Sequence, residues 1–268
     1  MDPELRSIME RVDRVENKSF VSLYEHAPAE LHAGSYEKDG VSVGWLASYE
    51  DAGFSAISNL DAAPDPDAAL REIIEMLKKE GVKVIGLDDH PDMDPAISPE
   101  WLADRGFKPD FHEQIWWRPL DEIESRPDPE GVRIERATLA DRDTFARVLN
   151  EGFGAGRHAG LGPAFAAVIG KEGWLHYIVY VDDEPGAAAA MFIDEGVADC
   201  FVASTRPAAR RRGAQTALII RRMRDGREAG CDIATAQSVT DNASPRNFER
   251  RGFRPLYRRT IYARRLEN

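Results

Sequence analysis

Apolar residues in the second half of the chain follow two different periods. Alternating or continuously apolar runs of about four to eight residues predict strands, whereas apolar residues spaced three and four apart predict helices. Strand-like runs occur in VRIER, HYIVYVDDEP, GAAAAMFIDEG, VADCFVAS, CDIATAQSV and LYRRTIYARRL. Three segments are helix-like. One begins at Asp141 and has Phe145, Val148 and Leu149 on its apolar side, a second ends near Glu228 before a stop at Gly230, and a third runs from Ser244 to Arg251. This order predicts an α/β (α+β) domain with a mixed, mostly antiparallel sheet flanked by helices.

A 23-residue segment occurs twice in the chain. SPEWLADRGFKPDFHEQIWWRPL at 98–120 and SPRNFERRGFRPLYRRTIYARRL at 244–266 align without a gap, and nine of the 23 positions are identical. Upstream, EGVKVIGL and AGCDIATA also correspond, at an offset larger by three residues. We infer a duplication. The polar, proline-containing segment EIESRPDPEG at 122–131 is typical of a linker and predicts two domains, 1–127 and 128–268.

Charge is distributed unevenly between these halves. The 268-residue chain has a formal net charge of -12, but residues 1–127 hold 13 Lys+Arg and 28 Asp+Glu, whereas 128–268 hold 22 and 19. An anion is therefore expected in the second half. The N-terminus is charged and no apolar run reaches membrane-spanning length, so we expect a cytoplasmic protein with no membrane partner. Cys200 and Cys231 lack a CxxC spacing and predict buried thiols rather than a metal site.

The basic segment TRPAARRRGAQTALI at 205–219 lies between a predicted strand and a predicted helix. A helix beginning near Gly213 would direct free backbone N–H groups and the helix dipole at one point, which attracts phosphate. Gly213 has no Cβ to block a ligand, and Arg210, Arg211 and Arg212 supply positive charge. An ordinary solvated helix start remains an alternative. A nucleic-acid arm is disfavoured because the first half is acidic and no DNA-binding motif surrounds the arginines.

VADCFVASTRPAARRRGAQTALI followed by SPRNFERRGF resembles the GNAT superfamily of acyl-CoA-dependent N-acetyltransferases, whose signature is R-x-x-G-x-G/A between the fourth strand and the third helix. The resemblance covers 132–266 and departs from the signature at Gln215, so either the loop is slightly wider or the Gln215 side chain turns away from a pyrophosphate. It implies acetyl-CoA as co-substrate, no metal, pyrophosphate bound by backbone N–H groups, and a pantetheine arm held like an extra strand. The implied cofactor-binding residues are Ala203, Ser204, Thr205, Arg210, Arg211, Arg212, Gly213, Ala214, Gln215, Thr216, Asn242 and Asn247.

The first copy lacks these features. At the corresponding place it reads SNLDAAPDPDAALREIIEM, without glycine and with Asp61, Asp65 and Asp67, which would repel a pyrophosphate. The resemblance therefore implies a degenerate GNAT-like domain at 1–127 and a catalytic domain at 128–268, as in tandem members such as mycothiol synthase. The first domain would wall one side of an acceptor groove. Its tryptophans either line that groove or belong to the core, and they are Trp101, Trp116 and Trp117.

Acyl transfer to an amine requires a neutral amine, and hence a proton acceptor or a water chain. Asp199 falls where many relatives carry a glutamate base, and strand alternation predicts that it shares a face with Phe201 and Ala203. A solvated aspartate is the alternative, and Glu195 and His176 are further candidates for the base. The family's usual acid is a tyrosine at the position of Phe248, so that role is vacant. Other phenols, Tyr257 and Tyr262, lie on the following strand.

These features predict an acetyl-CoA-dependent N-acetyltransferase that modifies a primary amine of a small acceptor. The acidic first half favours a cationic acceptor, such as a polyamine, an amino sugar or an amino acid, through electrostatic steering. A non-catalytic acyl-CoA-binding sensor or scaffold is the alternative. We expect no nucleic-acid partner, and a monomer or a homodimer.

Overall fold

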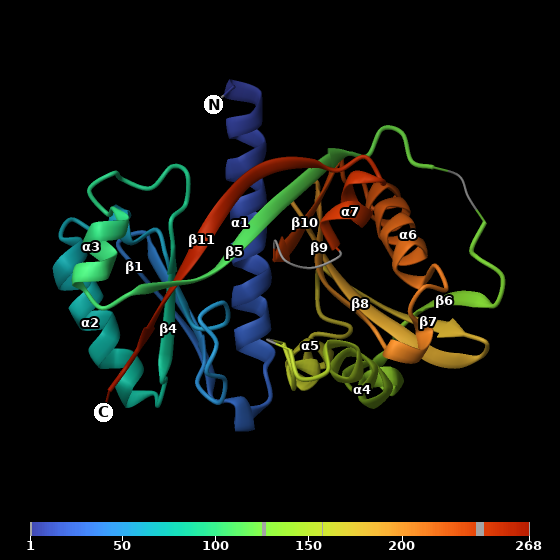
Figure 1. Cartoon of the computed structure of the whole chain (residues 1–268), viewed down its shortest axis with the longest axis horizontal. Helices are drawn as coiled ribbons and strands as arrows, with labels where there is room; N and C mark the ends of the chain where they lie inside the picture. Colours follow the sequence, from blue (N-terminus) through green and yellow to red (C-terminus); the bar gives the residue numbers. More distant parts are fainter. Residues whose placement is uncertain (1, 125–126, 157, 240–243, 268) are drawn as a thin grey trace. The chain divides into compact units, whose positions relative to one another are not determined.

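The computed structural model describes residues 2–124, 127–156, 158–239 and 244–267. The chain divides into two compact units, each assembled from two stretches of sequence. Unit 1 consists of Met1–Ser19 and Ile115–Leu256, and unit 2 consists of Phe20–Gln114 and Tyr257–Asn268. Both are α/β units with mixed, mostly antiparallel pairing, as the sequence predicts (Figure 1).

In unit 1, neighbouring strands follow the order β5, β10, β9, β8, β7, β6. Their bounds are β5 Lys108–Pro119, β10 Ile233–Val239, β9 Val197–Thr205, β8 Glu184–Asp194, β7 Trp174–Val181 and β6 Val132–Arg136. The β9–β10 pair is parallel, and β6 to β9 pair antiparallel. The helices are the first part of α1 Pro3–His26, η3 Leu139–Asp141, α4 Arg142–Phe153, α5 Gly162–Ala167, η4 Pro207–Ala209, α6 Ala214–Glu228 and α7 Ser244–Glu249.

In unit 2, neighbouring strands follow the order β1, β2, β3, β4, β11, β5. The bounds of the strands not yet given are β1 Ala33–Lys38, β2 Val41–Leu46, β3 Ala56–Ser58, β4 Val84–Asp88 and β11 Arg254–Arg265. The helices are η1 Ala29–Leu31, η2 Leu60–Ala62, α2 Pro66–Lys79 and α3 Pro99–Asp104. Its core consists of β2, β3 and β4 side chains packed with α2, and it includes Tyr262 from β11.

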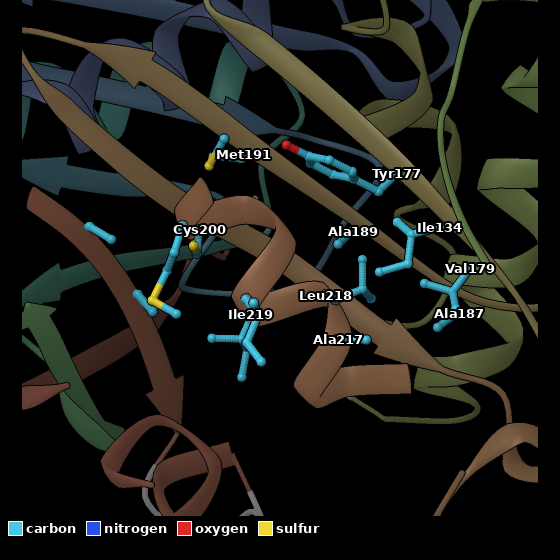
Figure 2. Packing of buried hydrophobic residues seen from close by; sticks show 14 of the residues in the cluster. Ile134, Tyr177, Val179, Ala187, Ala189, Met191, Cys200, Ala217, Leu218 and Ile219 are labelled. Carbon is cyan, nitrogen blue, oxygen red and sulfur yellow. The ribbon is translucent and has the colours of Figure 1, made fainter. Parts of the chain in front are cut away.

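Strand alternation gives the sheet of unit 1 two apolar faces. Tyr177 and Val179 of β7 join the core beneath α6, together with Ala187, Ala189 and Met191 of β8 (Figure 2). The intervening residues of β7 point to the opposite face, where His176 contacts α4 and α5. A sheet covered on both faces explains why these strands read as continuously apolar runs rather than as simple alternation.

The backbone reproduces the sequence repeat at the helix ends. In each copy a glycine with positive φ follows a helix, and the next N–H group bonds back to the last helical turn. The matched bonds are Val82 N to Leu77 O and Cys231 N to Gly226 O, then Phe107 N to Leu102 O and Phe253 N to Phe248 O. Each pair of bonds is related by the offset found in the sequence, so the two copies share local conformation as well as residues.

The predicted division at 127/128 does not follow the two units. The last strand of each copy crosses over: β5 begins in unit 2 and ends in unit 1, and β11 begins in unit 1 and ends in unit 2. Within unit 2, β11 pairs antiparallel with β4 from Ile261 opposite Asp88 to Arg265 opposite Val84. Because the two copies have the same strand pattern, the sequence alone does not say which sheet each last strand joins.

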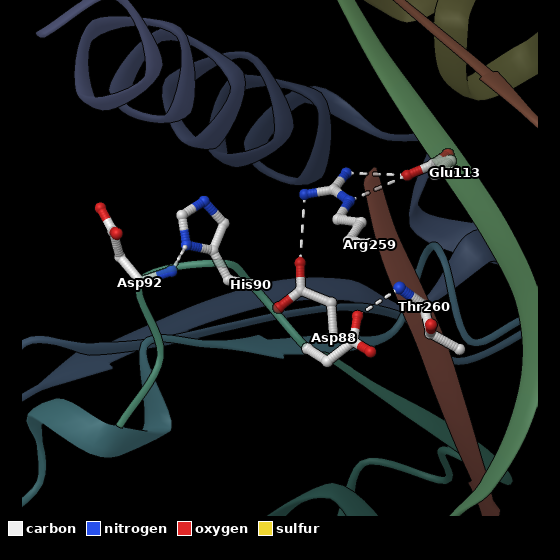
Figure 3. A network of polar contacts seen from close by, with 7 residues as sticks. Asp88, His90, Asp92, Glu113, Arg259 and Thr260 are labelled. Carbon is white, nitrogen blue, oxygen red and sulfur yellow. Dashed lines mark hydrogen bonds and ion pairs between the residues drawn. The ribbon is translucent and has the colours of Figure 1, made fainter. Parts of the chain in front are cut away.

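An ion-pair network anchors β11 within unit 2. The Arg259 guanidinium lies 3.1 Å from the Asp88 carboxylate and 2.9 Å from the Glu113 carboxylate, and all three side chains are at least four-fifths buried (Figure 3). The neighbouring Thr260 exchanges two hydrogen bonds with Asp89, one through its N–H and one through its carbonyl. The Arg259 cation therefore neutralises two carboxylates, one on each of the strands β4 and β5 that flank β11.

Replacing Arg259 with methionine would leave both carboxylates buried without their cation. We expect Arg259→Met to lower the free energy of unfolding by about 3 kcal/mol, measured by equilibrium urea unfolding. Arg265→Met on the same strand is the matched control, because Arg265 is 65% exposed and its ion pair with Glu50 is solvated. Adding Asp88→Asn to Arg259→Met should recover part of the loss. An Arg259→Met protein as stable as Arg265→Met would contradict this account.

Candidate functional site

The parallel pairing between β9 and β10 is short. Val197–Asp199 of β9 pair with Ile233–Thr235 of β10, and the register contains no later pair within the described parts of these strands. Both strands nevertheless continue, β9 to Thr205 and β10 to Val239. From Cys200 onward, the edge of β9 that faces β10 is therefore open. An open strand edge presents N–H and C=O groups to which an extended ligand can add as a further strand.

A β-bulge in β9 begins where this pairing ends. On the other side of β9, Phe192 of β8 pairs with Asp199 and Ala190 pairs with Val202, so Cys200 and Phe201 together oppose Met191 alone. The extra residue changes the alternation of side chains. Phe201 packs on Phe165 and Trp174, whereas Ala203 packs on the core beneath α6. The prediction that Phe201 and Ala203 share a face is therefore wrong, because regular alternation was assumed across a bulge.

Helix α6 begins shortly after β9, and its N-terminus has no side-chain cap. Gly213 occupies the N-cap position at φ 84°, and its carbonyl accepts the first helical bond, from Ala217 N. The N–H groups of the first helical turn therefore have no intrahelical acceptor. A Cβ at Gly213 would lie 2.7 Å from the Pro129 ring, so both the φ angle and the contact require glycine. This N-terminus has the free N–H groups and the dipole that bind anions.

The three arginines of the loop have different environments. Arg212 forms an exposed ion pair with Asp182 at 2.8 Å. Arg210 donates to the carbonyls of Thr205 and Gly152, which folds the loop back onto the end of β9. Arg211 has a positive φ of 61°, is exposed, and makes no ion pair with any described residue. Arg211 is therefore the cation of this loop that is available to a ligand.

The side chain of Gln215 turns toward α7. Its Oε1 accepts a hydrogen bond of 2.7 Å from Asn247 Nδ2. Gln215, which replaces the small residue of the signature, is thus accommodated by its contact with Asn247, another predicted site residue. At the end of β9, the Ser204 hydroxyl donates to Leu149 O of α4, while Ala203 and Thr205 pair with β8. Asn242 and the adjacent Asp241 lie outside the described residues.

Unit 2 contains the matching helix start, but a carboxylate occupies it. Asp65 is the N-cap of α2, and its Oδ1 accepts from Ala68 N at 2.9 Å. Asp67 in the first turn forms an ion pair with Arg105 at 2.6 Å. Asp61 accepts from Asp94 N. The acidic residues of the first copy therefore satisfy the protein's own N–H groups and cations, where α6 leaves N–H groups free.

Asp199 is completely buried and lies at the point where β9 and β10 separate. It directly opposes Phe192, which in turn opposes Trp174 and packs on its ring. Asp199 is thus on the face of the sheet that α4 and α5 cover, and the alternative of a solvated aspartate is wrong. Asp199 is buried because its position on β9 places it in this row of apolar side chains.

His176 lies on the same face, two strands away, and is also buried. Its Nε2 bonds to the Phe165 carbonyl at 3.0 Å, so this nitrogen carries the proton, while Nδ1 has no hydrogen-bond partner in the described structure. Burial lowers the pKa of His176 to about 4, although the bond to Phe165 opposes the shift. The ring is therefore neutral near pH 7, and it ties β7 to α5.

Glu195 occupies the turn between β8 and β9. Hydrogen bonds from Lys18 and then Arg14 of α1 lower the pKa of this carboxyl below its usual value. A carboxylate held by two cations is a poor proton acceptor. Its geometry therefore indicates a role in attaching α1 to this turn within unit 1.

The aromatic candidates are mainly core residues. Phe248 packs on Trp116 and Phe253, which explains how a phenylalanine is accommodated where the resemblance would predict a tyrosine. Trp116 and Trp117 are buried, and Arg105 stacks 3.6 Å above the partly exposed Trp101 ring. Tyr257 and Tyr262 are both buried and belong to unit 2, where Tyr257 packs on His90.

Neither a metal centre nor a membrane span is found in the described parts of the chain. These residues contain no group of three or more His, Cys, Asp or Glu arranged to hold a metal ion. No helix among them is long and apolar enough to cross a bilayer. Cys200 and Cys231 are buried free thiols, as predicted, and burial raises the pKa of both.

Solved structures with the same fold span nearly the whole chain. A GCN5-related N-acetyltransferase from Kribbella flavida matches with a TM-score of 0.64 and 14% identity over 91% of this chain and 95% of that one. One from Sphaerobacter thermophilus matches with a TM-score of 0.62 and 13% identity over 85% and 81%. A tandem GNAT protein from the clavulanic acid biosynthesis pathway matches with a TM-score of 0.58 and 12% identity over 87% and 82%. This chain has the GNAT fold. No family model and no curated protein matches the sequence.

Within the GNAT fold, sequence reasoning missed two features of the site. The bulge leaves no mark in the strand pattern, because VADCFVAST is mostly apolar and contains no regular alternation that an extra residue would interrupt. The second feature, Arg222, is the bulkiest fully buried side chain among the described residues, and its burial does leave a mark in the sequence. Ala214, Leu218 and Arg222 are spaced four apart, so helical periodicity places the arginine on the buried side of α6.

The buried His176 predicts a pH-dependent stability. The folded state binds a proton at this ring only near pH 4, whereas the unfolded chain binds it near pH 6.5. Stability from this residue is therefore present above pH 6.5 and is lost as the pH falls toward 4. At pH 4.5 the loss should be about 2 to 3 kcal/mol.

Urea unfolding at pH 7 and pH 4.5 checks this expectation. Wild type should lose about 2 to 3 kcal/mol more of its unfolding free energy between pH 7 and pH 4.5 than His176→Gln does. His112→Gln is the control, because His112 is exposed. An equal pH dependence in wild type and His176→Gln would show that His176 is not the titrating group.

Proposed function

We propose that the protein is an acetyl-CoA-dependent N-acetyltransferase that acetylates a primary amine of a small acceptor. The observation that carries this proposal is the early end of the β9–β10 pairing, which leaves an open strand edge leading to an uncapped helix N-terminus. An extended arm with an anionic end suits this combination. The GNAT fold is consistent with it.

The residues of unit 1 divide into three roles in this proposal. The open edge at Ala203, Ser204 and Thr205 binds the pantetheine arm as an added strand. The loop and first turn of α6, with Arg211 as the free cation, bind the pyrophosphate, and α7 contributes Asn247. Acetyl-CoA, when bound, supplies a thioester whose carbonyl carbon is attacked by the amine. The residues proposed to bind the pyrophosphate are Arg210, Arg211, Arg212, Gly213, Ala214, Gln215 and Thr216. Asn242 is proposed as a further cofactor-binding residue.

We propose Asp199 as the proton acceptor for the attacking amine. Its place at the separation point of β9 and β10 is where an arm running along the open edge would end. The amine nitrogen forms the new amide bond, loses its proton to the carboxylate, and the C–S bond breaks to release the thiolate. With Phe248 at the family's acid position, water protonates that thiolate. Domain 1–127 is proposed as a GNAT-like copy that binds no acetyl-CoA.

The acceptor is proposed to be a small cationic molecule: a polyamine, an amino sugar or an amino acid. Residues 1–127 have a net charge of -15, and such a field raises the local concentration of cations without direct contact. A non-catalytic acyl-CoA sensor is favoured by one observation, namely the apolar packing of Phe248 where an acid would stand. Thiol release over a panel of these amines distinguishes the two, because a sensor would bind acetyl-CoA without releasing thiol.

Calorimetric titration should find one acetyl-CoA site per chain. The reason is that the free N-terminus of α6 has no counterpart in unit 2, where Asp65 caps α2. Arg211→Glu should weaken binding about tenfold or more by placing an anion beside the pyrophosphate. Arg227→Glu is the matched control, since it makes the same charge change at the exposed far end of α6. Absence of binding would refute the function, and two equivalent sites would refute the assignment of the first copy.

Asp199→Asn preserves size but removes the proton acceptor. We expect kcat to fall about 10²- to 10⁴-fold near pH 7. The loss should shrink as the pH rises, because more of the acceptor amine is then already neutral. Asp232→Asn is the control, since Asp232 is 63% exposed and pairs with Arg11. A loss below about threefold at all pH values would remove Asp199 from the mechanism.

A further inference from the structure

Arg222 is a buried cation inside the core of unit 1. It lies in the middle of α6 and is 1% exposed, and α6 packs on the sheet through the apolar residues of this core. Figure 2 shows two of the nearby sheet residues, Met191 and Cys200, next to α6. An arginine on the buried side of a helix costs desolvation energy, which must be offset by what the guanidinium contacts.

The guanidinium contacts the backbone beside the bulge. Arg222 Nη1 donates to the carbonyl of Ala190 on β8 and to the carbonyl of Val202 on β9, both at 3.4 Å. Ala190 and Val202 are the paired residues that flank the bulge on its Thr205 side. A third bond joins Arg222 Nε to Leu218 O of its own helix. One side chain of α6 therefore links both strands at the place where the register shifts.

This cation has no carboxylate partner within 4.0 Å among the residues that the structure describes. The acid nearest to it on the helix, Asp225, binds Arg136 and Arg221 instead. Arginine keeps its positive charge in proteins, so the charge acts only on backbone carbonyls and neighbouring groups. If its role were to fill space, methionine would do so without the desolvation cost.

We propose that Arg222 is a positioning residue that fixes the β9 bulge and so keeps 202–205 of β9 available as an open edge for the pantetheine arm. The proposal rests on the proposed function, because it assigns the arm to that edge. Arg222 belongs to α6, whose N-terminus would hold the pyrophosphate, but among the described residues outside its own helix it bonds only to the strands beside the bulge, where the arm would bind. It would act on the arm alone, since it lies two turns from the helix N-terminus.

Two ligands separate these effects. Coenzyme A carries both the pyrophosphate and the pantetheine arm, and 3′-phospho-ADP carries the pyrophosphate without the arm. We expect Arg222→Met to weaken coenzyme A binding about tenfold or more, while 3′-phospho-ADP binds within about twofold of wild type. Arg222→Lys, which keeps the charge but loses the forked geometry, should be intermediate. Arg227→Met on the exposed face of α6 is the control and should bind both ligands as wild type does.

The outcomes differ for the two proposals. Equal weakening of both ligands, or no weakening of either, would overturn the role of Arg222. Failure of the wild-type protein to bind coenzyme A would overturn the proposed function instead. Amide hydrogen exchange without ligand then tests Arg222 by itself: exchange at 200–205 should be faster in Arg222→Met than in wild type and Arg227→Met. Unchanged exchange there would overturn the positioning role, and if Arg222→Met does not fold, Arg222→Lys gives the same comparison.

Discussion

The extra residue in β9 is the constraint on which the candidate site depends. Up to Asp199, β9 pairs on both sides, with β8 and with β10. Because a bulge rotates the strand that follows it, the later part of β9 keeps its pairing with β8 and leaves β10. The open edge, the position of Asp199 at the separation point and the approach of the strand to the α6 N-terminus all follow from this one-residue shift.

Much of unit 1 could be predicted because its local signals agree with its tertiary structure. Apolar periodicity located β7, β8, β9 and α6, and the glycines Gly230 and Gly252 located the ends of α6 and α7. The phosphate-loop prediction rested on Gly213, whose positive φ and proximity to Pro129 exclude a side chain. The predicted helix start near Gly213 is confirmed, because the conformation there admits only glycine and the residue therefore reports the conformation; phosphate binding at this start stays a prediction.

The features that sequence reasoning missed depend on choices between equivalent partners. Strands β5 and β11 carry the same pattern, and nothing in either says that β11 pairs with β4. That choice is visible only in the Arg259 contacts with Asp88 and Glu113, which join residues far apart in sequence. Likewise, the burial of Asp199 follows from the residues opposite it on β8 and β7, not from its own strand.

The two copies show how one position separates a closed helix start from an open one. In α2, Asp65 satisfies a first-turn N–H group, and an N-cap of this kind stabilises a helix by a few tenths of a kcal/mol relative to glycine. In α6, Gly213 supplies no side chain, so the helix forgoes that stabilisation and keeps its first-turn N–H groups free. A protein selected for stability alone would cap both helices. The uncapped start of α6 is therefore a small local cost, and it is consistent with the proposal that an anion provides the missing acceptor.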